Sequence, residues 1–359
     1  MGCGRGLLSL FFNNTRPKKL ESSPSLSGND SKILEELITS SNCKCNVPAR
    51  VFSAKELIKA TNHFSCHNMV IEDAFYSVNK GSFENQSILV KKYRKEDCFW
   101  PSDKIKSYAI RDIKITSQMC SHEHVLKFIG CCLELQFSAL VYEYKGKIQF
   151  LSHGLHERVP GSVHNGSLSW KSRLSIANDI ASALVYLHTT FSTPIVHRNL
   201  KPSNFIIDQG GVAKLLDFSL SISIPQGESQ VEDMVVGTCG FTEPKYMATG
   251  ILTSKTDVYS FGAILLEILT GQMFVDVNRG KNHDLLGNFV IDNVNKGKLN
   301  KVVDPRTMVE EGGIEQEKQF GAFVAIALKC TEEKREDRPE MINVAEELKR
   351  IQRFVDTDH

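Results

Sequence analysis

The sequence lacks a dominant charge. Its 359 residues hold 43 lysines and arginines against 42 aspartates and glutamates, a formal net charge of +1. Proteins that bind nucleic acid usually carry an excess of basic side chains, because these attract the phosphate backbone. The balance therefore argues against a nucleic-acid partner.

Long hydrophobic runs and patterned cysteines are also missing, and the chain has no internal repeats. The longest apolar stretches, such as residues 261–266, are far shorter than the roughly 20 residues that a membrane-spanning helix needs. The ten cysteines form no C-x-x-C pair with a matching second pair, so no zinc site is expected. Unpatterned cysteines in a chain of this length are typical of a reducing compartment. We therefore expect a cytoplasmic protein.

The N-terminus begins Met1-Gly-Cys-Gly-Arg-Gly6, followed by an apolar run. A glycine at position 2 beside a cysteine predicts N-myristoylation of Gly2 and palmitoylation of Cys3, two signals that together would hold the chain at the inner face of the plasma membrane. The small hydroxyl residue usual at position 6 is missing, so a tail without lipid is the alternative. Residues 13–30 are rich in Asn, Ser, Pro and Lys and are predicted to be a flexible linker. A short helix is predicted over residues 32–38.

The first half of the remaining chain reads mainly as strands. Ser53-Ala-Lys-Glu56 is a capping box, which predicts the start of a helix. Alternating and β-branched residues then predict short strands between residues 69 and 92. A helix is predicted only after these strands. The predicted elements are strands at 74–78 and 87–90, a helix at 105–119, and strands around 125–129 and 139–142.

Helical periodicity dominates from Trp170 onward. An apolar stripe runs over residues 176–187, and residues 258–269 are apolar nearly all round, which predicts a buried helix. Asp208-Gln-Gly-Gly211 predicts the turn of a hairpin. A strand-rich part followed by a helix-rich part predicts two lobes with a cleft between them.

Two segments carry the chemical signal. Val196-His-Arg-Asn-Leu-Lys-Pro-Ser-Asn204 and Leu216-Asp-Phe-Ser219 resemble the catalytic loop and the D-F-G segment of protein kinases. In that chemistry an Asp accepts the substrate proton, while an Asn and the D-F-G Asp hold Mg²⁺ on the phosphates of ATP. The resemblance places Asn204 and Asp217 at the two metal positions and Lys201 in the catalytic loop.

Lys91, in Ile88-Leu-Val-Lys91, matches the kinase lysine that binds the ATP phosphates. A solvated strand lysine is the alternative. Its usual glutamate partner is not obvious, and Asp112, one methylene shorter, is the best candidate. Tyr142 matches the gatekeeper tyrosine of the nucleotide pocket.

Further segments extend the resemblance. Residues 237–244 are similar to the end of an activation segment, residues 257–262 to the start of the helix that supports the catalytic loop, and Arg338 to a structural kinase arginine. Together with residues 51–65 they identify the chain as a plant receptor-like cytoplasmic kinase of the Pelle/IRAK-related group, over about residues 50–352. The resemblance implies an α+β, bilobal protein-kinase fold. The domains it implies are a flexible segment at 1–49, an N-lobe at 50–144, a C-lobe at 145–352 and a tail at 353–359.

The departures from the family point to lost catalysis. Asn199 replaces the catalytic aspartate, and the loss of a positioned base costs roughly 10²- to 10⁴-fold in rate. Residues 70–78 contain none of the three close glycines, and their acidic side chains would repel phosphates. Ser219 replaces the D-F-G glycine, a milder change. We therefore expect weak or absent binding of ATP and Mg²⁺ and little phosphoryl transfer.

One departure concerns structure. Lys245 stands where a glutamate usually pairs with the arginine matched by Arg338. This ion pair, the Arg338 lock, is therefore expected to be weak unless another carboxylate takes the place of the glutamate. His197 is read as a packed structural histidine, and His122 and His124 as loop residues rather than ligands. Arg198 is expected to bind either a phosphorylated activation segment or a carboxylate.

Within the family, the lost glycines, the short N-terminal extension, the His-Arg-Asn triplet and the segment around Cys239 resemble the ZED/ZRK pseudokinase subgroup. That resemblance implies an adaptor that binds a coiled-coil nucleotide-binding leucine-rich-repeat receptor and senses pathogen effectors, or receptor-like cytoplasmic kinases that effectors have modified. A slow serine/threonine kinase that uses another base is one alternative. Another is a decoy whose activation segment mimics an effector target through its hydroxyl residues Ser221, Ser223, Ser229, Thr238 and Thr242.

Overall fold

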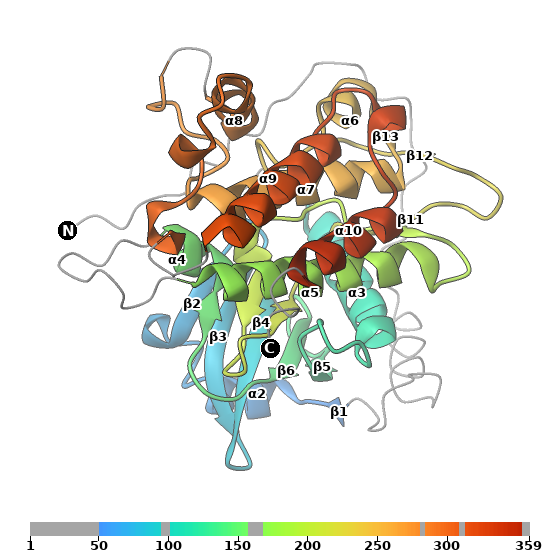
Figure 1. The fold of residues 1–359 in the computed structure, drawn as a ribbon. Helices are drawn as coiled ribbons and strands as arrows, with labels where there is room; N and C mark the ends of the chain where they lie inside the picture. The colour runs from blue at the N-terminus through green and yellow to red at the C-terminus, as the bar shows by residue number, and fades with distance from the viewer. Residues whose placement is uncertain (1–49, 95–100, 157–167, 281–283, 309–312, 354–359) are drawn as a thin grey trace. The chain divides into compact units, whose positions relative to one another are not determined.

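The structure is a computed structural model that describes residues 50–94, 101–156, 168–280, 284–308 and 313–353. The chain divides into two compact units (Figure 1). The N-terminal unit runs to Lys147 and also holds Leu216–Ser221, and the C-terminal unit holds Ile148–Leu215 and the chain from Ile222 onward. Gly2, Cys3 and the helix predicted over 32–38 lie outside the described residues.

A six-stranded sheet forms the core of the N-terminal unit, in the order β1-β5-β6-β4-β3-β2. Only β1 and β5 pair in parallel. The strands are β1 (Arg50–Val51), β2 (Met69–Glu72), β3 (Tyr76–Phe83), β4 (Gln86–Tyr93), β5 (Phe128–Cys132) and β6 (Ala139–Glu143). The turn between β3 and β4 places Glu84 and Asn85 at positive φ, as the tight turn of a two-residue hairpin requires.

Two helices accompany this sheet. Helix α2 (Ala54–Ala60) begins with the predicted capping box, in which the Ser53 hydroxyl accepts from the Glu56 amide and the Glu56 carboxylate accepts from the Ser53 amide. Leu57 of α2 packs with Phe52 and with strand residues in one fully buried cluster. Helix α3 (Ser102–Met119) contains the predicted helix over 105–119. A short 3-10 helix, η1 (Cys66–Asn68), precedes β2.

Helices build most of the C-terminal unit. They are α4 (Leu151–His156), α5 (Trp170–Thr189), α6 (Pro244–Thr249), α7 (Ser254–Thr270), α8 (Leu286–Asn295), α9 (Gly313–Cys330) and α10 (Met341–Arg353), with 3-10 turns η2 (Pro202–Asn204), η3 (Leu299–Lys301), η4 (Pro305–Thr307) and η5 (Arg335–Asp337). Nearly every residue of α7 is buried, which confirms the predicted buried helix. Among the described residues, no helix combines the length and the apolar character needed to span a bilayer.

Short strands shape the loops of this unit. They are β7 (Gln149–Phe150), β8 (Ile195–Val196), β9 (Phe205–Ile207), β10 (Ala213–Leu215), β11 (Ile222–Ser223), β12 (Val231–Glu232) and β13 (Ile251–Leu252). Strands β9 and β10 form the predicted hairpin, in which the Asp208 carboxylate accepts from the amides of Gly210 and Val212. Strand β12 pairs with β13, and this pairing holds the start of the segment that follows β12.

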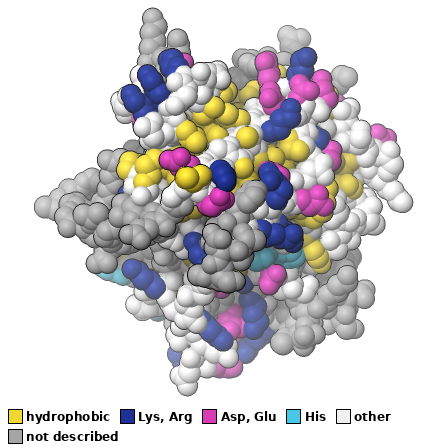
Figure 2. All heavy atoms as spheres, viewed as in Figure 1, with side chains coloured by type: hydrophobic (Ala, Val, Ile, Leu, Met, Phe, Trp, Pro, Cys, Tyr) yellow, Lys and Arg dark blue, Asp and Glu magenta, His cyan; other side chains and the backbone are white. Residues whose placement is uncertain are grey.

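A buried arginine joins three parts of the C-terminal unit. Arg173 of α5 donates to the carbonyl of Ile268 in α7 at 2.7 Å and forms an ion pair with Asp304 at 2.6 Å. On the face in Figure 2, hydrophobic side chains gather over the helices of this unit with charged side chains between them. The exposed large hydrophobic residues include Ile291 on α8, Ile314 on α9 and Ile342 on α10.

Candidate active site

Lys91 lies in a fully buried cluster of charged and aromatic side chains in the N-terminal unit. Its Nζ atom is 2.6 Å from Asp112 Oδ2 and 2.5 Å from Asp217 Oδ1. The Tyr93 hydroxyl donates to the same Asp112 oxygen at 2.8 Å. The shorter Asp112 side chain therefore does reach Lys91, and the alternative of a solvated strand lysine is wrong.

The charges in this cluster hold Lys91 in its protonated form. Burial alone would lower the pKa of Lys91, but the nearby carboxylates of Asp112 and Asp217 outweigh that effect and raise it above its ordinary value of 10.5. One cation and two carboxylates give the cluster a formal charge of −1, so it repels an anionic phosphate unless a metal ion compensates.

The segment 70–78 that lacks the glycines covers most of β2, a short turn over residues 73–75 and the start of β3. The Asp73 amide donates to the Tyr76 carbonyl at 2.9 Å and closes the turn. Of the two acidic residues expected to repel phosphates, Glu72 is half exposed and pairs with Arg94 at 3.0 Å. The turn leads directly into Tyr76, whose buried ring lies over the ammonium of Lys91, with 3.9 Å between Nζ and the ring centroid.

Asp217 and its neighbours are part of the N-terminal unit and are held there by hydrogen bonds. Asp217 has a φ of 86°, a conformation that non-glycine residues rarely adopt. The Phe218 amide donates to Asp112 Oδ1 at 2.8 Å, and the Ser219 amide donates to Asp217 Oδ1 at 3.1 Å. Asp112 therefore fixes both Lys91 and the D-F-S segment.

Tyr142 lies on β6, opposite Leu89 of β4. Its side chain is buried, and its ring packs edge-on against that of Phe128 at a centroid distance of 6.1 Å. Burial raises the pKa of its phenol well above its ordinary value.

In the C-terminal unit, the side chain of Asn199 is engaged by a neighbour. Its Oδ1 accepts a hydrogen bond from the Thr238 hydroxyl at 2.8 Å. The Asn204 side-chain amide donates to the Asn199 carbonyl at 2.9 Å, and the Asn199 amide donates to His197 Nδ1 at 3.3 Å. His197 is buried, as a structural histidine should be. At the position of the catalytic base, the loop therefore holds an amide side chain, which cannot accept a proton as a carboxylate does.

Lys201 caps the N-terminal end of η2 and is partly exposed. As oxygen donors, the Asp217 carboxylate and the Asn204 carboxamide suit Mg²⁺, but Asp217 is already ion-paired with Lys91. The described ranges contain no group of three or more His, Cys, Asp and Glu side chains arranged to hold a metal ion.

Arg198 binds a carboxylate of the activation segment. Its Nη1 is 2.8 Å from Asp233 Oδ2, its Nε donates to the Tyr246 hydroxyl at 2.7 Å, and its Nη2 donates to the Met234 carbonyl. The same Tyr246 hydroxyl accepts from the Val236 amide at 3.0 Å. An unphosphorylated segment is therefore anchored through Asp233, one of the two partners expected for Arg198.

The five predicted hydroxyl residues of the activation segment differ in access. Ser221 and Thr242 are buried, and the Thr242 hydroxyl donates to the Thr238 carbonyl at 2.9 Å. Thr238 is partly buried and engaged with Asn199 as described. Ser223 and Ser229 are exposed, so these two are the accessible candidates for modification.

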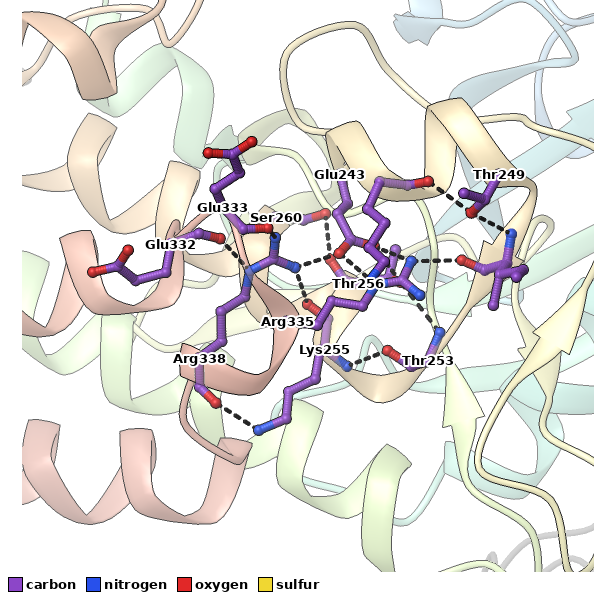
Figure 3. A network of polar contacts seen from close by, with 12 residues as sticks. Glu243, Thr249, Thr253, Lys255, Thr256, Ser260, Glu332, Glu333, Arg335 and Arg338 are labelled. Atoms are coloured by element: carbon purple, nitrogen blue, oxygen red, sulfur yellow. Dashed lines mark hydrogen bonds and ion pairs between the residues drawn. The ribbon is translucent and has the colours of Figure 1, made fainter.

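Glu243 is the other carboxylate that keeps the Arg338 lock intact, which is the alternative left open for Lys245 (Figure 3). Glu243 Oε1 lies 2.5 Å from Arg338 Nη1, and its two oxygens accept from Arg335 at 2.6 and 2.5 Å. The Thr256 hydroxyl donates to Glu243 Oε2 at 2.9 Å. Lys245 lies exposed two residues further on and does not approach as a second buried cation.

Two arginines determine the ionisation of Glu243. Burial alone would raise the pKa of this carboxyl, but hydrogen bonds and charge from Arg335 and Arg338 outweigh burial and hold it below 4.5. Glu243 is therefore ionised at neutral pH. The network joins α6, α7 and the segment before α10, at the end of the activation segment.

Comparison with known proteins agrees with this architecture. Residues 75–347 match the family model of the protein kinase domain, so the chain belongs to the protein kinase family. It is 38% identical to serine/threonine-protein kinase ZRK1 of Arabidopsis thaliana over 95% of both chains. It is 39% identical to the non-functional pseudokinase ZED1 of the same plant, over 90% of this chain and 94% of that protein. These relatives place it in the ZED/ZRK subgroup of plant receptor-like kinases.

The more distant similarity is to wall-associated receptor kinase 5 of Arabidopsis thaliana, 33% identical over 85% of this chain and 40% of that longer protein. Relatives of the subgroup are thus named both as kinases and as non-functional pseudokinases. Membership of this subgroup is therefore compatible with an active kinase and with a pseudokinase.

Sequence reasoning missed three functional side chains. Tyr76 lies in the segment 70–78 that lacks the glycines and has no motif role of its own, although its place two residues before Val78 puts both side chains on one face of the strand. Asp233 carries no motif, and Glu243 lies in the segment 237–244 that resembles the end of an activation segment but has no motif role of its own. Their roles depend on contacts with Arg198 and Arg338, far away in the sequence.

Proposed function

We propose that this chain is a pseudokinase that acts as an adaptor or decoy in plant innate immunity. In this role it binds a coiled-coil nucleotide-binding leucine-rich-repeat receptor and senses pathogen effectors or effector-modified receptor-like cytoplasmic kinases. The proposal on partners is supported by membership of the ZED/ZRK subgroup, and the loss of catalysis by the site itself. ATP and Mg²⁺ bind weakly or not at all.

The observation that carries the proposal is the state of Asn199. The backbone and neighbours of the catalytic loop are in place, yet the side chain at the base position is a neutral amide that already accepts from Thr238. Without a base, the rate falls by roughly 10²- to 10⁴-fold. In the N-terminal unit, residues 70–78 lack the three close glycines, so the segment that covers the phosphates in active kinases is impaired as well.

Phosphate transfer is the direct test. The purified chain is incubated with radiolabelled ATP and Mg²⁺ or Mn²⁺, and the background is the same reaction with EDTA. Lys91→Met is a poor background variant here, because it removes a buried ion pair and disturbs the fold. Transfer at the EDTA background supports the pseudokinase. Clear metal-dependent transfer contradicts it.

The second candidate is a weakly active serine/threonine kinase, favoured by the names of the relatives ZRK1 and ZRK4. Asn199→Asp separates the two. The new carboxylate can still accept from Thr238, so the fold is preserved while the base returns. A slow kinase limited by its base would gain roughly 10²- to 10⁴-fold. If the chain is a pseudokinase, little gain is expected, because residues 70–78 still lack the glycines that let the backbone approach the phosphates.

Adaptor function is tested by co-purification. The chain is co-expressed with coiled-coil nucleotide-binding leucine-rich-repeat receptors of its plant, and complexes are separated by size. The kinase domain of wall-associated receptor kinase 5 is the matched control. A stable complex formed by this chain, but not by the control, supports the adaptor. Failure to form a complex with any of these receptors counts against it.

The decoy role is tested on the activation segment. Mass spectrometry after exposure to effectors would locate modified hydroxyls, and we expect them at the exposed Ser223 and Ser229 rather than at the buried Ser221 and Thr242. An unmodified segment would argue against a decoy. Attachment to the inner face of the plasma membrane through Gly2 and Cys3 is part of the same proposal. Loss of membrane association in Gly2→Ala would support it.

A further inference from the structure

The Lys91 ammonium is surrounded by side chains of its own unit. An ammonium carries three donors and no acceptor. Two point to the carboxylates of Asp112 and Asp217, and the ring of Tyr76 covers Nζ at 3.9 Å. A second ring, that of Tyr93, lies 5.1 Å from Nζ. No part of the Lys91 side chain is exposed.

Strand register explains why Tyr76 covers Lys91. Strands β3 and β4 pair with Val78 opposite Lys91 and with Tyr76 opposite Tyr93. Side chains two residues apart in a strand share one face of the sheet, so Tyr76 is the diagonal neighbour of Lys91 and within reach of a large ring. The contact is therefore built into the pairing of two regular strands.

We propose that Tyr76 is the residue that denies Lys91 to a nucleotide phosphate. This inference rests on the proposed pseudokinase function and assigns its loss of nucleotide binding to one side chain. A phosphate oxygen must come within about 3 Å of Nζ to bind it. Two directions are taken by the carboxylates of Asp112 and Asp217, and the aromatic face of Tyr76 covers the ammonium beside them. The ring also attracts the ammonium through its π face, so moving it aside breaks a favourable contact.

The ring of Tyr76, rather than its hydroxyl, covers the ammonium of Lys91. Within the described ranges the buried Tyr76 hydroxyl has no hydrogen-bond partner. Removing it leaves the cover in place, whereas removing the ring opens it. Tyr76→Phe and Tyr76→Gly are therefore a matched pair that differ in the feature under test.

The experiment measures binding of ATP with Mg²⁺ to the full chain by calorimetric titration, for the wild type and both variants. We expect Tyr76→Gly to bind at least about tenfold more tightly than the wild type, and Tyr76→Phe to behave like the wild type. Equal affinity of wild type and Tyr76→Gly, with the glycine variant folded by its cooperative thermal unfolding, would overturn the inference.

A measurement on the wild type keeps the inference testable if the glycine variant fails to fold. The native chain is acetylated with an N-hydroxysuccinimide ester, and the labelling of each lysine is followed by mass spectrometry. Lys91 should label far more slowly than its neighbour Lys92, which is partly exposed. Equal labelling of the two would refute the cover. Phosphate transfer by the wild type, in contrast, would refute the proposed function itself.

Discussion

Removing the Glu243 carboxylate should destabilise the C-terminal unit strongly. Glu243→Ala leaves Arg335 and Arg338 buried without their counter-ion, and Arg338 is only 2% exposed. Breaking a buried ion pair by removal of one partner costs about 3–5 kcal/mol. For a unit of this size, each kcal/mol lowers the melting temperature by roughly 2–4 °C. A fall of about 6 °C or more is expected.

The assay is thermal unfolding followed by circular dichroism, with Lys245→Ala as the matched control. Lys245 lies two residues further on, in the first turn of α6, and is exposed, so its removal should change stability by less than about 0.5 kcal/mol. If Glu243→Ala and Lys245→Ala melted at the same temperature, the assignment of the lock to Glu243 would be refuted.

The same carboxylate predicts a pH dependence. The folded-state pKa of Glu243 lies below its ordinary value of 4.5, so its contribution is fully present above that pH and is lost as the pH falls through the lower, folded-state value. The stability difference between wild type and Glu243→Gln should therefore shrink below about pH 4.5. A difference that stays constant down to pH 3 would contradict this sign.

Three further results follow from the geometry. Lys91→Met leaves two buried carboxylates without their cation, so it should lower the free energy of unfolding by about 3–5 kcal/mol. Chemical denaturation measures this change, and an unchanged free energy of unfolding would contradict the prediction. Asp233→Ala should speed amide hydrogen exchange in the activation segment, while Glu228→Ala, an exposed neighbour, should not; equal exchange would exclude Asp233 as the anchor. Native protein should be alkylated by iodoacetamide at exposed Cys66 and not at Cys330, because burial raises the pKa of the Cys330 thiol to about 12; rapid loss of the Cys330 thiol would refute this.

The Lys91 prediction has a close internal control. Lys92 is the next residue of β4, and its side chain lies on the opposite face of the strand, where its Nζ atom is 4.3 Å from the Phe64 ring centroid. Lys92→Met keeps most of the apolar contact and removes no buried ion pair. It should therefore change stability far less than Lys91→Met.

Features with a local cause could be predicted from the sequence. The helix that begins after Ser53 was predicted because a capping box is satisfied within four residues. The hairpin at Asp208 likewise depends on neighbours in the chain. The strand predicted around 125–129 was displaced, because Val125 and Leu126 are buried without being in the strand that begins at Phe128.

Features that depend on contacts between residues far apart in the sequence could not be predicted from it. The lock between Glu243 and Arg338 joins residues 95 positions apart, and no spacing rule connects them. Motif comparison found Lys245 at the usual position and could only leave open that another carboxylate serves. The cover of Lys91 by Tyr76 depends on strand register, which single-sequence patterns do not fix to one residue.

The position of Glu243 also leaves position 245 outside the buried charge balance. One carboxylate pairs with both Arg335 and Arg338, while the side chain at 245 is exposed. Substitutions at an exposed position of this kind usually change stability little. The surface beside the end of the activation segment can therefore vary in charge without weakening the ion pairs beneath it.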